Sequence, residues 1–377
     1  MPASDMGSIA RCCVMMPSTS LDRQHLWPEA EISLNSLPKP NTIPAKTIKA
    51  IKKSKMVTKT TLHAAAMFAA TAAALKDIPA LGLGTWLSDK DLVPHAVEFG
   101  LINGYDHIDA AWIYRNENET GKGIAAADLP REDIWVTSKL WNSAHRETEA
   151  GEQIRESLAK LGLDYLDLYL VHWPVAFVPG QGTTLDEETS IVDTWRALEG
   201  LVRANLTRHI GISNFAKKDV EAILEICEIC PYAHEYETHP YLQQQDFLDY
   251  HDEKGIKVIA YSPLGNTNPT YKKHANLEPL LKDPFWADLA EKKNATPAQA
   301  VLAWGIQRGT IVIPKSTTDK HLLQNLVALD ITFTDAELED IAKQDKKARF
   351  SNPSKNWGVN LFSDLDDHFN DLNEDEL

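Results

Sequence analysis

Cysteine and basic residues are both scarce in this sequence. Four of its 377 residues are cysteines, too few for a disulfide framework in a chain of this length. Cys227 and Cys230 form a C-x-x-C pair at helical spacing, without a second pair or a histidine at ligand spacing. We therefore expect no metal site and predict buried or half-buried thiols. Lys and Arg number 38 against 54 Asp and Glu, a net charge of −16, which argues against nucleic acid and anionic membrane surfaces as partners.

The sequence also lacks an apolar run that is long and hydrophobic enough to predict a membrane-spanning helix. Residues 56–75, within an alanine-rich segment 56–77, form an apolar run of signal-peptide length that is too short and too rich in alanine for a stable membrane span. Two interpretations stay open, a secretory signal that begins at Met56 or a plain helix. The last four residues, Glu-Asp-Glu-Leu, resemble a degenerate endoplasmic-reticulum retrieval signal. We expect a cytoplasmic protein, or one of the secretory pathway if Met56 is the true start.

The two ends of the chain differ in composition from its middle. Residues 1–55 mix Pro, Ser, Thr and Lys without periodicity, so we predict a disordered extension. Residues 348–377 are expected to form a C-terminal substrate loop and an acidic tail, because residues 361–377 hold seven acids and no Lys or Arg.

Strand-like and helix-like segments alternate through the middle of the chain. Apolar runs predict strands at residues 78–85, 105–110, 134–140, 165–173, 208–214, 233–239, 257–263 and 310–315. Helical patterns separate them, and a final helix is predicted after Thr334, with Glu337 completing a capping box. Because parallel strands need crossover helices, eight such units predict an α/β fold, a (β/α)8 TIM barrel over residues 78–347. Its active site is expected at the C-terminal ends of the strands.

Polar residues stand at the ends of the predicted strands. Asp109 ends the second strand, Lys139 the third and His172 the fourth. A lysine at the end of an apolar strand is costly to bury unless it is paired, and Asp109 on the neighbouring strand is the expected partner.

The sequence resembles the aldo-keto reductase family over about residues 78–350. The strings that carry the resemblance, in the family's order and spacing, are GLGTW (82–86), HIDAAWIY (107–114), WVTSKLW (135–141), LYLVHWP (168–174), IGISNF (210–215), HPYLQQ (239–244), AYSPLG (260–265) and IPKS (313–316). The resemblance implies a catalytic tetrad of Asp109, Tyr114, Lys139 and His172. In these roles Tyr114 is the general acid, the Lys139 ammonium makes it a stronger acid, Asp109 holds the lysine, and neutral His172 orients the substrate carbonyl.

The resemblance also implies a binding site for NADP(H) that extends across a barrel, which agrees with the lack of a GxGxxG motif. Its expected cofactor residues are Thr85, Trp86, Ser213, Asn214, Glu235, Tyr261, Ser262, Leu264, Lys315, Ser316, Thr317, His321, Gln324 and Asn325. Its expected substrate-binding residues are Trp86, Trp112, His172 and Trp173.

Three features depart from the family pattern. Glu235 stands where the family usually places a glutamine that holds the cofactor's carboxamide, and an ionised glutamate accepts hydrogen bonds but donates none. His321 stands where NADPH-preferring members often have an arginine, so NAD(H) use beside NADP(H) is also expected. The hairpin that normally precedes GLGTW is replaced by the alanine-rich run.

The expected function is a monomeric enzyme that reversibly reduces an aldehyde or ketone, such as a sugar, polyol or glyceraldehyde type, to the alcohol. The alternative is a cofactor-binding regulatory or structural barrel with negligible turnover, favoured slightly by Glu235 and His321. The partner in either case is a small molecule. Substrate choice is expected to depend on the loops at residues 175–190 and 266–285 and on the segment from Phe350.

Overall fold

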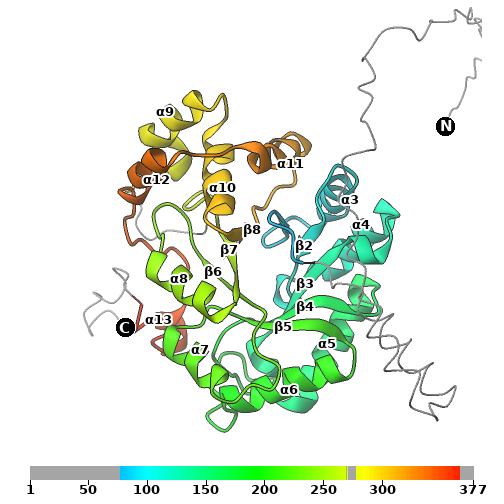
Figure 1. Ribbon diagram of the computed structural model, residues 1–377. Helices are drawn as coiled ribbons and strands as arrows, with labels where there is room; N and C mark the ends of the chain where they lie inside the picture. Colours follow the sequence, from blue (N-terminus) through cyan, green and yellow to red (C-terminus); the bar gives the residue numbers. More distant parts are fainter. Residues whose placement is uncertain (1–76, 269, 271–276, 366–377) are drawn as a thin grey trace, which may run out of the picture. The chain divides into compact units, whose positions relative to one another are not determined.

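Eight parallel strands form one curled sheet in the computed structural model, which describes residues 77–268, 270 and 277–365 (Figure 1). The strands pair in chain order, each with the next. They are β1 (Leu83–Gly84), β2 (His107–Asp109), β3 (Trp135–Leu140), β4 (Leu166–Val171), β5 (Thr207–Ser213), β6 (Ala233–Glu237), β7 (Lys257–Tyr261) and β8 (Thr310–Val312). At the two edges of the sheet, Leu81 forms a parallel bridge with Val312, and Gly84 forms one with Lys315.

Helices follow the strands, as parallel pairing requires. They are α3 (Val93–Ile102), α4 (Glu117–Ala127), α5 (Glu147–Leu161), α6 (Ile191–Arg203), α7 (Lys217–Leu224), α8 (Gln245–Lys254), α9 (Pro284–Lys292), α10 (Pro297–Gln307), α11 (Asp319–Leu326), α12 (Asp335–Ala342) and α13 (Ser354–Trp357). Short 3-10 turns are η1 (Trp112–Tyr114), η2 (Arg131–Asp133), η3 (Asn142–Ala144), η4 (Leu280–Lys282) and η5 (Val327–Asp330). None of the helices in the described ranges is long and apolar enough to cross a bilayer.

Local sequence explains where several helices begin. The predicted capping box before α12 is confirmed, since Thr334 Oγ1 accepts from the Glu337 amide and the Glu337 carboxylate accepts from the Thr334 amide. Ser190 and Asp193 cap α6 in the same way. Each box satisfies amides that the first turn of a helix leaves without a partner.

The core is packed closely around the central strands. All residues of β3 and β4 are buried, and one apolar layer joins Trp135 of β3, Leu168 and Leu170 of β4, and Ile259 of β7. Helices close the outer layer, and α4 meets the end of α5 so tightly that a Cβ at Gly121 would stand 2.5 Å from the Leu161 carbonyl oxygen. Apolar burial of this kind, worth about 25 cal/mol per Å2, holds the strands whose ends carry the polar residues.

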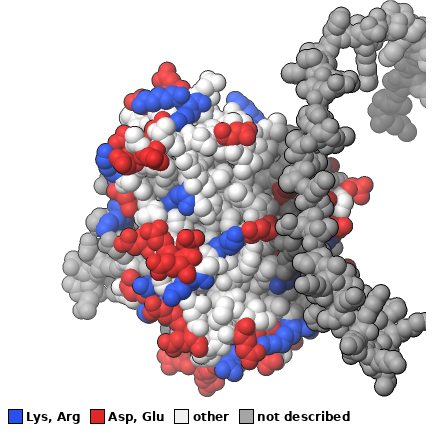
Figure 2. Space-filling model, viewed as in Figure 1, with Lys and Arg blue, Asp and Glu red and all other residues white. Residues whose placement is uncertain are grey.

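Charged side chains of both signs are interspersed on the described surface shown in Figure 2. The predicted extension 1–55 and nearly all of the segment 56–77 lie outside the described residues, as does the acidic end 366–377.

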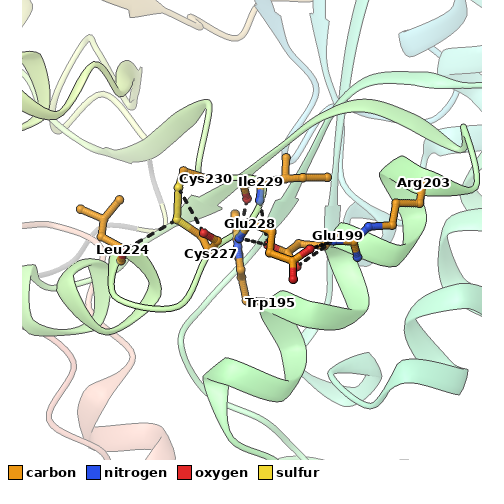
Figure 3. Close-up of a disulfide and its surroundings, with 8 residues drawn as sticks. All are labelled: Trp195, Glu199, Arg203, Leu224, Cys227, Glu228, Ile229 and Cys230. Atoms are coloured by element: carbon orange, nitrogen blue, oxygen red, sulfur yellow. Dashed lines mark hydrogen bonds and ion pairs between the residues drawn. A yellow bond between two sulfur atoms is a disulfide. The ribbon is translucent and has the colours of Figure 1, made fainter.

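The prediction of free thiols at Cys227 and Cys230 was wrong, because the two residues form a disulfide (Figure 3). Helix α7 ends at Leu224, so the pair does not lie at helical spacing but in the following loop, where the two Cα atoms are 5.0 Å apart. That separation falls within the range a disulfide needs.

The disulfide loop is held against α6 (Figure 3). The buried Glu199 Oε1 accepts from the amides of Glu228, at 2.6 Å, and Ile229, at 2.9 Å. Trp195 Nε1 donates to the Ile229 carbonyl at 3.1 Å. The loop connects α7 to the start of β6, so it lies at the opposite end of the sheet from the carboxyl ends of the strands.

Candidate active site

A cavity of about 630 Å3 opens at the carboxyl ends of the strands. Successive strand ends supply its polar wall: Asp109 at the end of β2, His172 after β4, Ser213 at the end of β5 with Asn214 after it, Glu235 on β6, and Tyr261 and Ser262 at the end of β7. Residues far apart in the sequence meet here because all parallel strands end on the same side.

The expected ion pair between Asp109 and Lys139 is present and fully buried. Lys139 Nζ lies 2.7 Å and 2.8 Å from the two Asp109 carboxylate oxygens and 3.0 Å from the Ala110 carbonyl oxygen. Burial disfavours the ammonium, but the carboxylates of Asp109 and Glu235 outweigh it and raise the pKa of Lys139 above its ordinary value. Lys139 is therefore a permanent cation at physiological pH.

Tyr114 follows β2 on the turn η1 and faces the cavity. Its ring centroid lies 5.2 Å from Lys139 Nζ and 5.8 Å from the His172 ring, which it meets edge-on. Burial raises the pKa of Tyr114 above its ordinary value, while the Lys139 charge lowers it and the carboxylates of Asp109 and Glu235 raise it. The expected acidifying effect of Lys139 is thus present but outweighed, so Tyr114 keeps its proton until charge develops near it.

His172 is a neutral imidazole. Burial and the positive charge of Lys139 both hold the pKa of His172 well below its ordinary value. Its carbonyl oxygen accepts from Asn214 Nδ2 at 3.0 Å, and its Nδ1 has no hydrogen-bond partner among the described residues. A neutral ring is able to donate one hydrogen bond to a substrate oxygen.

Three non-glycine residues on the cavity wall, Leu87, Asn214 and Ser262, hold a left-handed backbone that disfavours ordinary side chains. Asn214 has φ 62° and Ser262 has φ 47°. Asn214 is fixed further, because its Oδ1 accepts from Tyr261 Oη at 2.7 Å and its Nδ2 donates to Ser213 Oγ at 3.0 Å. Backbone strain of this kind costs about 1–3 kcal/mol per residue and is concentrated at binding sites.

Glu235 is 2% exposed and lines the same cavity. Its Oε1 lies 3.3 Å from Lys139 Nζ, and its Oε2 has no hydrogen-bond partner among the described residues. Burial raises the pKa of Glu235 well above its ordinary value, as does the neighbouring charge of Asp109, while Lys139 opposes both. A buried acceptor left over in a cavity is a place where a ligand completes the hydrogen bonding.

The other expected cofactor residues divide into two groups. Trp86, Leu264 and Lys315 line the cavity, and Thr85 is buried next to it, with Oγ1 donating to the Asp109 carbonyl at 2.9 Å. Five residues from the end of β8 through α11 are not part of this cavity's lining: Ser316, Thr317, His321, Gln324 and Asn325. Their role stays a prediction.

The expected substrate residues are also divided. Trp86 and Trp173 line the cavity, but Trp112 does not. The Trp112 indole packs under Arg115, at 3.8 Å, and its Nε1 donates to Glu156 at 2.7 Å. The next residue, Ile113, lines the cavity instead of Trp112.

Sequence reasoning missed Trp141, which meets the His172 ring edge-on with centroids 5.3 Å apart. Its position directly after β3, two residues beyond Lys139, was the available signal. Trp141 also contacts Trp357 of the C-terminal segment, at 6.3 Å between ring centroids. Together with Trp173 these rings form an apolar wall beside His172.

The C-terminal segment supplies this side of the cavity through Phe350, Ser351, Asn352, Pro353, Asn356 and Trp357. Its anchor is the fully buried Glu237, at the end of β6. One Glu237 oxygen accepts from the Phe350 amide at 2.7 Å and from His239 Nε2 at 2.8 Å, and the other accepts from the Ser351 amide at 2.7 Å. Beyond α13, Asp364 accepts from the Lys218 amide at 2.8 Å and holds the segment beside α7 (Figure 1).

Comparison with known proteins agrees with this geometry. Residues 80–346 match the family described as "Aldo/keto reductase family". The chain is 44% identical over 287 residues to "Aldo/keto reductase slr0942" from Synechocystis sp., covering 73% of this chain and 88% of that protein. It is 40% identical over 289 residues to "Aldo-keto reductase family 1 member A1" from Sus scrofa, covering 73% and 89%.

Solved structures show the same similarity in three dimensions. An aldose reductase from Schistosoma japonicum superposes with a TM-score of 0.70 at 35% identity, covering 76% of this chain and 95% of that one. An aldose reductase from Giardia lamblia superposes with a TM-score of 0.68 at 34% identity, covering 75% and 97%.

Proposed function

Because the chain belongs to the aldo/keto reductase family, an oxidoreductase family, we propose that it reversibly reduces an aldehyde to the alcohol with NADP(H). The observation that carries the proposal is the buried Asp109–Lys139 pair beside Tyr114 and His172 in one cavity. We further propose that the sheet closes into a (β/α)8 barrel, which the parallel bridges between the β1 and β8 edges support.

The cavity suits a dinucleotide. When bound, the dinucleotide supplies the hydride, and Ser213, Asn214, Glu235 and Tyr261 are the residues proposed to hold its nicotinamide end. The fit rests on the unsatisfied Glu235 Oε2 and on the fixed, left-handed Asn214, both at the cavity wall. Lys315 lines the same cavity and offers a cation to a phosphate. Because His321 stands where NADPH-preferring members often have an arginine, we propose that the same site also accepts NAD(H).

Acid catalysis is assigned to Tyr114. Hydride transfer to a carbonyl carbon places negative charge on the carbonyl oxygen, which must gain a proton as the charge forms. Tyr114 Oη–H donates that proton, and Lys139 stabilises the phenolate that remains. Asp109 keeps Lys139 in place, so the proton donor and its counter-charge stay at fixed positions.

Substrate orientation is assigned to His172 and the aromatic wall. The neutral imidazole donates a hydrogen bond to the same carbonyl oxygen, which selects one orientation of the carbonyl. Trp86, Trp141 and Trp173 surround the reacting end with apolar surface. We infer that an aldehyde with an apolar or aromatic group next to its carbonyl fits better than a fully hydroxylated one, the aldehyde-reductase type of activity.

The test is consumption of NADPH, followed by absorbance, with a panel of small aldehydes and the full-length protein. Tyr114→Phe should lower kcat by about 10²- to 10⁴-fold, because the general acid is lost while the ring remains. Tyr250→Phe is the matched control, since the Tyr250 hydroxyl lies on α8 without a hydrogen-bond partner among the described residues and outside the cavity lining.

Two results would count against the proposal. A Tyr114→Phe variant as active as the wild type would remove Tyr114 from the chemistry. A wild-type protein that binds NADP(H) tightly but reduces none of the aldehydes would favour the alternative, a cofactor-binding protein without turnover.

A further inference from the structure

Two carboxyl groups share one lysine inside the cavity. Lys139 Nζ lies 2.7 Å from Asp109 Oδ1 and 3.3 Å from Glu235 Oε1. The side chains of all three residues are 3% exposed or less. With both carboxylates ionised this buried cluster would carry a net negative charge, which a low-dielectric site disfavours. Asp109 has the two short bonds to the lysine, so Glu235 is the group that retains a proton.

Several other groups surround Glu235. On β5, Ser213 is paired in register with Glu235, and on β7 the paired residue is the apolar Ile259. The ionisable groups that face it across the cavity or lie on its wall are Asp109, Tyr114, Lys139, His172, Tyr261 and Lys315. Among the described residues, Lys139 carries the one positive charge within ion-pair distance of Glu235. The Lys139 ammonium already forms a closer ion pair with Asp109. A new positive charge near Oε2 would therefore change the protonation of Glu235 strongly.

The reaction brings such a charge. A nicotinamide ring is positively charged when oxidised and neutral when reduced. For a hydride to reach a carbonyl held by Tyr114 and His172, the ring must lie in this cavity, on whose wall Glu235 lies. Glu235 lines this cavity, and its buried Oε2 has no hydrogen-bond donor among the described residues, so the ring's charge would act on a carboxyl oxygen that no protein group satisfies.

We propose that Glu235 couples the redox state of the bound cofactor to one proton, being a carboxylate beside the oxidised ring and a carboxylic acid beside the reduced ring. As an acid, its O–H is also able to donate to the carbonyl oxygen of the cofactor's amide, which an ionised glutamate cannot do. This inference rests on the proposed function, since it needs NADP(H) in the cavity. It assigns a positioning residue that also sets the enzyme's preference for one cofactor form.

The sign follows from linkage. The oxidised ring favours the ionised form and so lowers the pKa of Glu235, whereas the neutral ring leaves it raised by burial and by Asp109. At a pH between these two pKa values, binding of the oxidised form releases a proton from Glu235, whereas binding of the reduced form does not. The ratio of the dissociation constants, oxidised over reduced, should therefore fall by up to about tenfold for each unit of rising pH.

The experiment measures the dissociation constants of NADP+ and NADPH for the full-length protein by quenching of tryptophan fluorescence, from pH 6.5 to 9. The phosphate groups titrate alike in both forms, so their effect cancels in the ratio. The wild type should show the falling ratio, and Glu235→Gln should show a ratio that does not change with pH. Glu253→Gln, at an exposed glutamate of α8, is the matched control and should keep the wild-type slope.

A second measurement needs no variant. Calorimetric titration in two buffers of different ionisation enthalpy counts the protons released on binding, and NADP+ should release more than NADPH does, by up to one proton. A pH-independent ratio in the wild type, equal proton counts, or an unchanged slope in Glu235→Gln would each overturn the inference while leaving the proposed function intact. Failure of the wild type to bind either cofactor form would instead overturn the proposed function, and this inference with it.

Discussion

The anchor of the C-terminal segment offers a sharp test of how the cavity is built. Glu237→Gln keeps the shape of the side chain but replaces one of its two acceptor oxygens by an NH2 donor. Since the two oxygens accept from Phe350, His239 and Ser351, at least one buried or partly buried N–H must lose its acceptor in either orientation of the amide. Such an unpaired group costs about 1–3 kcal/mol, and the remaining bonds lose the strength that the carboxylate charge gave them.

We expect a total loss of about 2 kcal/mol in the attachment of residues 350–357, or roughly 30-fold in the equilibrium between the attached and the detached segment. Hydrogen exchange at the Phe350 and Ser351 amides should therefore accelerate by roughly that factor. The KM for the aldehyde should rise because the segment forms one wall of the substrate cavity. The dissociation constant of NADP(H) should change little, since the residues proposed to hold its nicotinamide end lie on β5 to β7.

Glu253→Gln serves here too as the control for the same chemical change at an exposed site. Unchanged exchange and an unchanged KM in Glu237→Gln would refute the reasoning. They would mean that other contacts hold the segment, such as Arg349, which lies 3.9 Å from the Phe362 ring centroid and donates to Gln244 Oε1 at 2.9 Å.

Two further predictions concern stability. Gly121→Ala should lower the free energy of unfolding by about 1–3 kcal/mol, because its Cβ would stand 2.5 Å from the Leu161 carbonyl oxygen, whereas Gly200→Ala on α6 meets nothing within 4 Å and should gain about 0.5–1 kcal/mol. Urea denaturation compares the two, and an equal response would contradict the packing of α4 on α5. Replacing both Cys227 and Cys230 by serine should cost at most about 2 kcal/mol, because the bridge closes a loop of about four residues. The variant should keep wild-type kcat and KM, measured with the same NADPH assay, and a loss of activity would show that the loop influences the distant cavity.

The strand ends were the most predictable part of the molecule. A parallel sheet places all of its carboxyl ends on one side, so Asp109, Lys139 and His172 could be brought together from their positions alone. The ion pair followed from the cost of burying a lysine. The order of strands and the start of α12 after Thr334 came from local signals of the same kind.

Features that depend on exact backbone geometry could not be predicted. The disulfide could be predicted only by knowing that α7 stops at Leu224, and the sequence ILEICEIC (223–230) contains no such stop signal. Trp112 and Ile113 are neighbours, but the turn η1 decides which of them faces the cavity. Glu237 reaches amides more than a hundred positions away, and no local pattern indicates such a contact.

The acidity of Tyr114 was only partly predictable. The effect of Lys139 followed from charge, but the opposing effect of burial depends on how deeply η1 packs. The same holds for Glu235, whose departure from the family pattern was visible in the sequence while its distance from Lys139 was not.

The left-handed backbone at Asn214 and Ser262 limits how the enzyme is best redesigned. Asparagine, aspartate and glycine tolerate that conformation, whereas a β-branched residue does not, so most substitutions at either position would disturb the loop itself. A mutant library aimed at changing cofactor choice would gain little from randomising these two sites. Its diversity belongs at Glu235 and Lys315, which line the same cavity with an ordinary backbone.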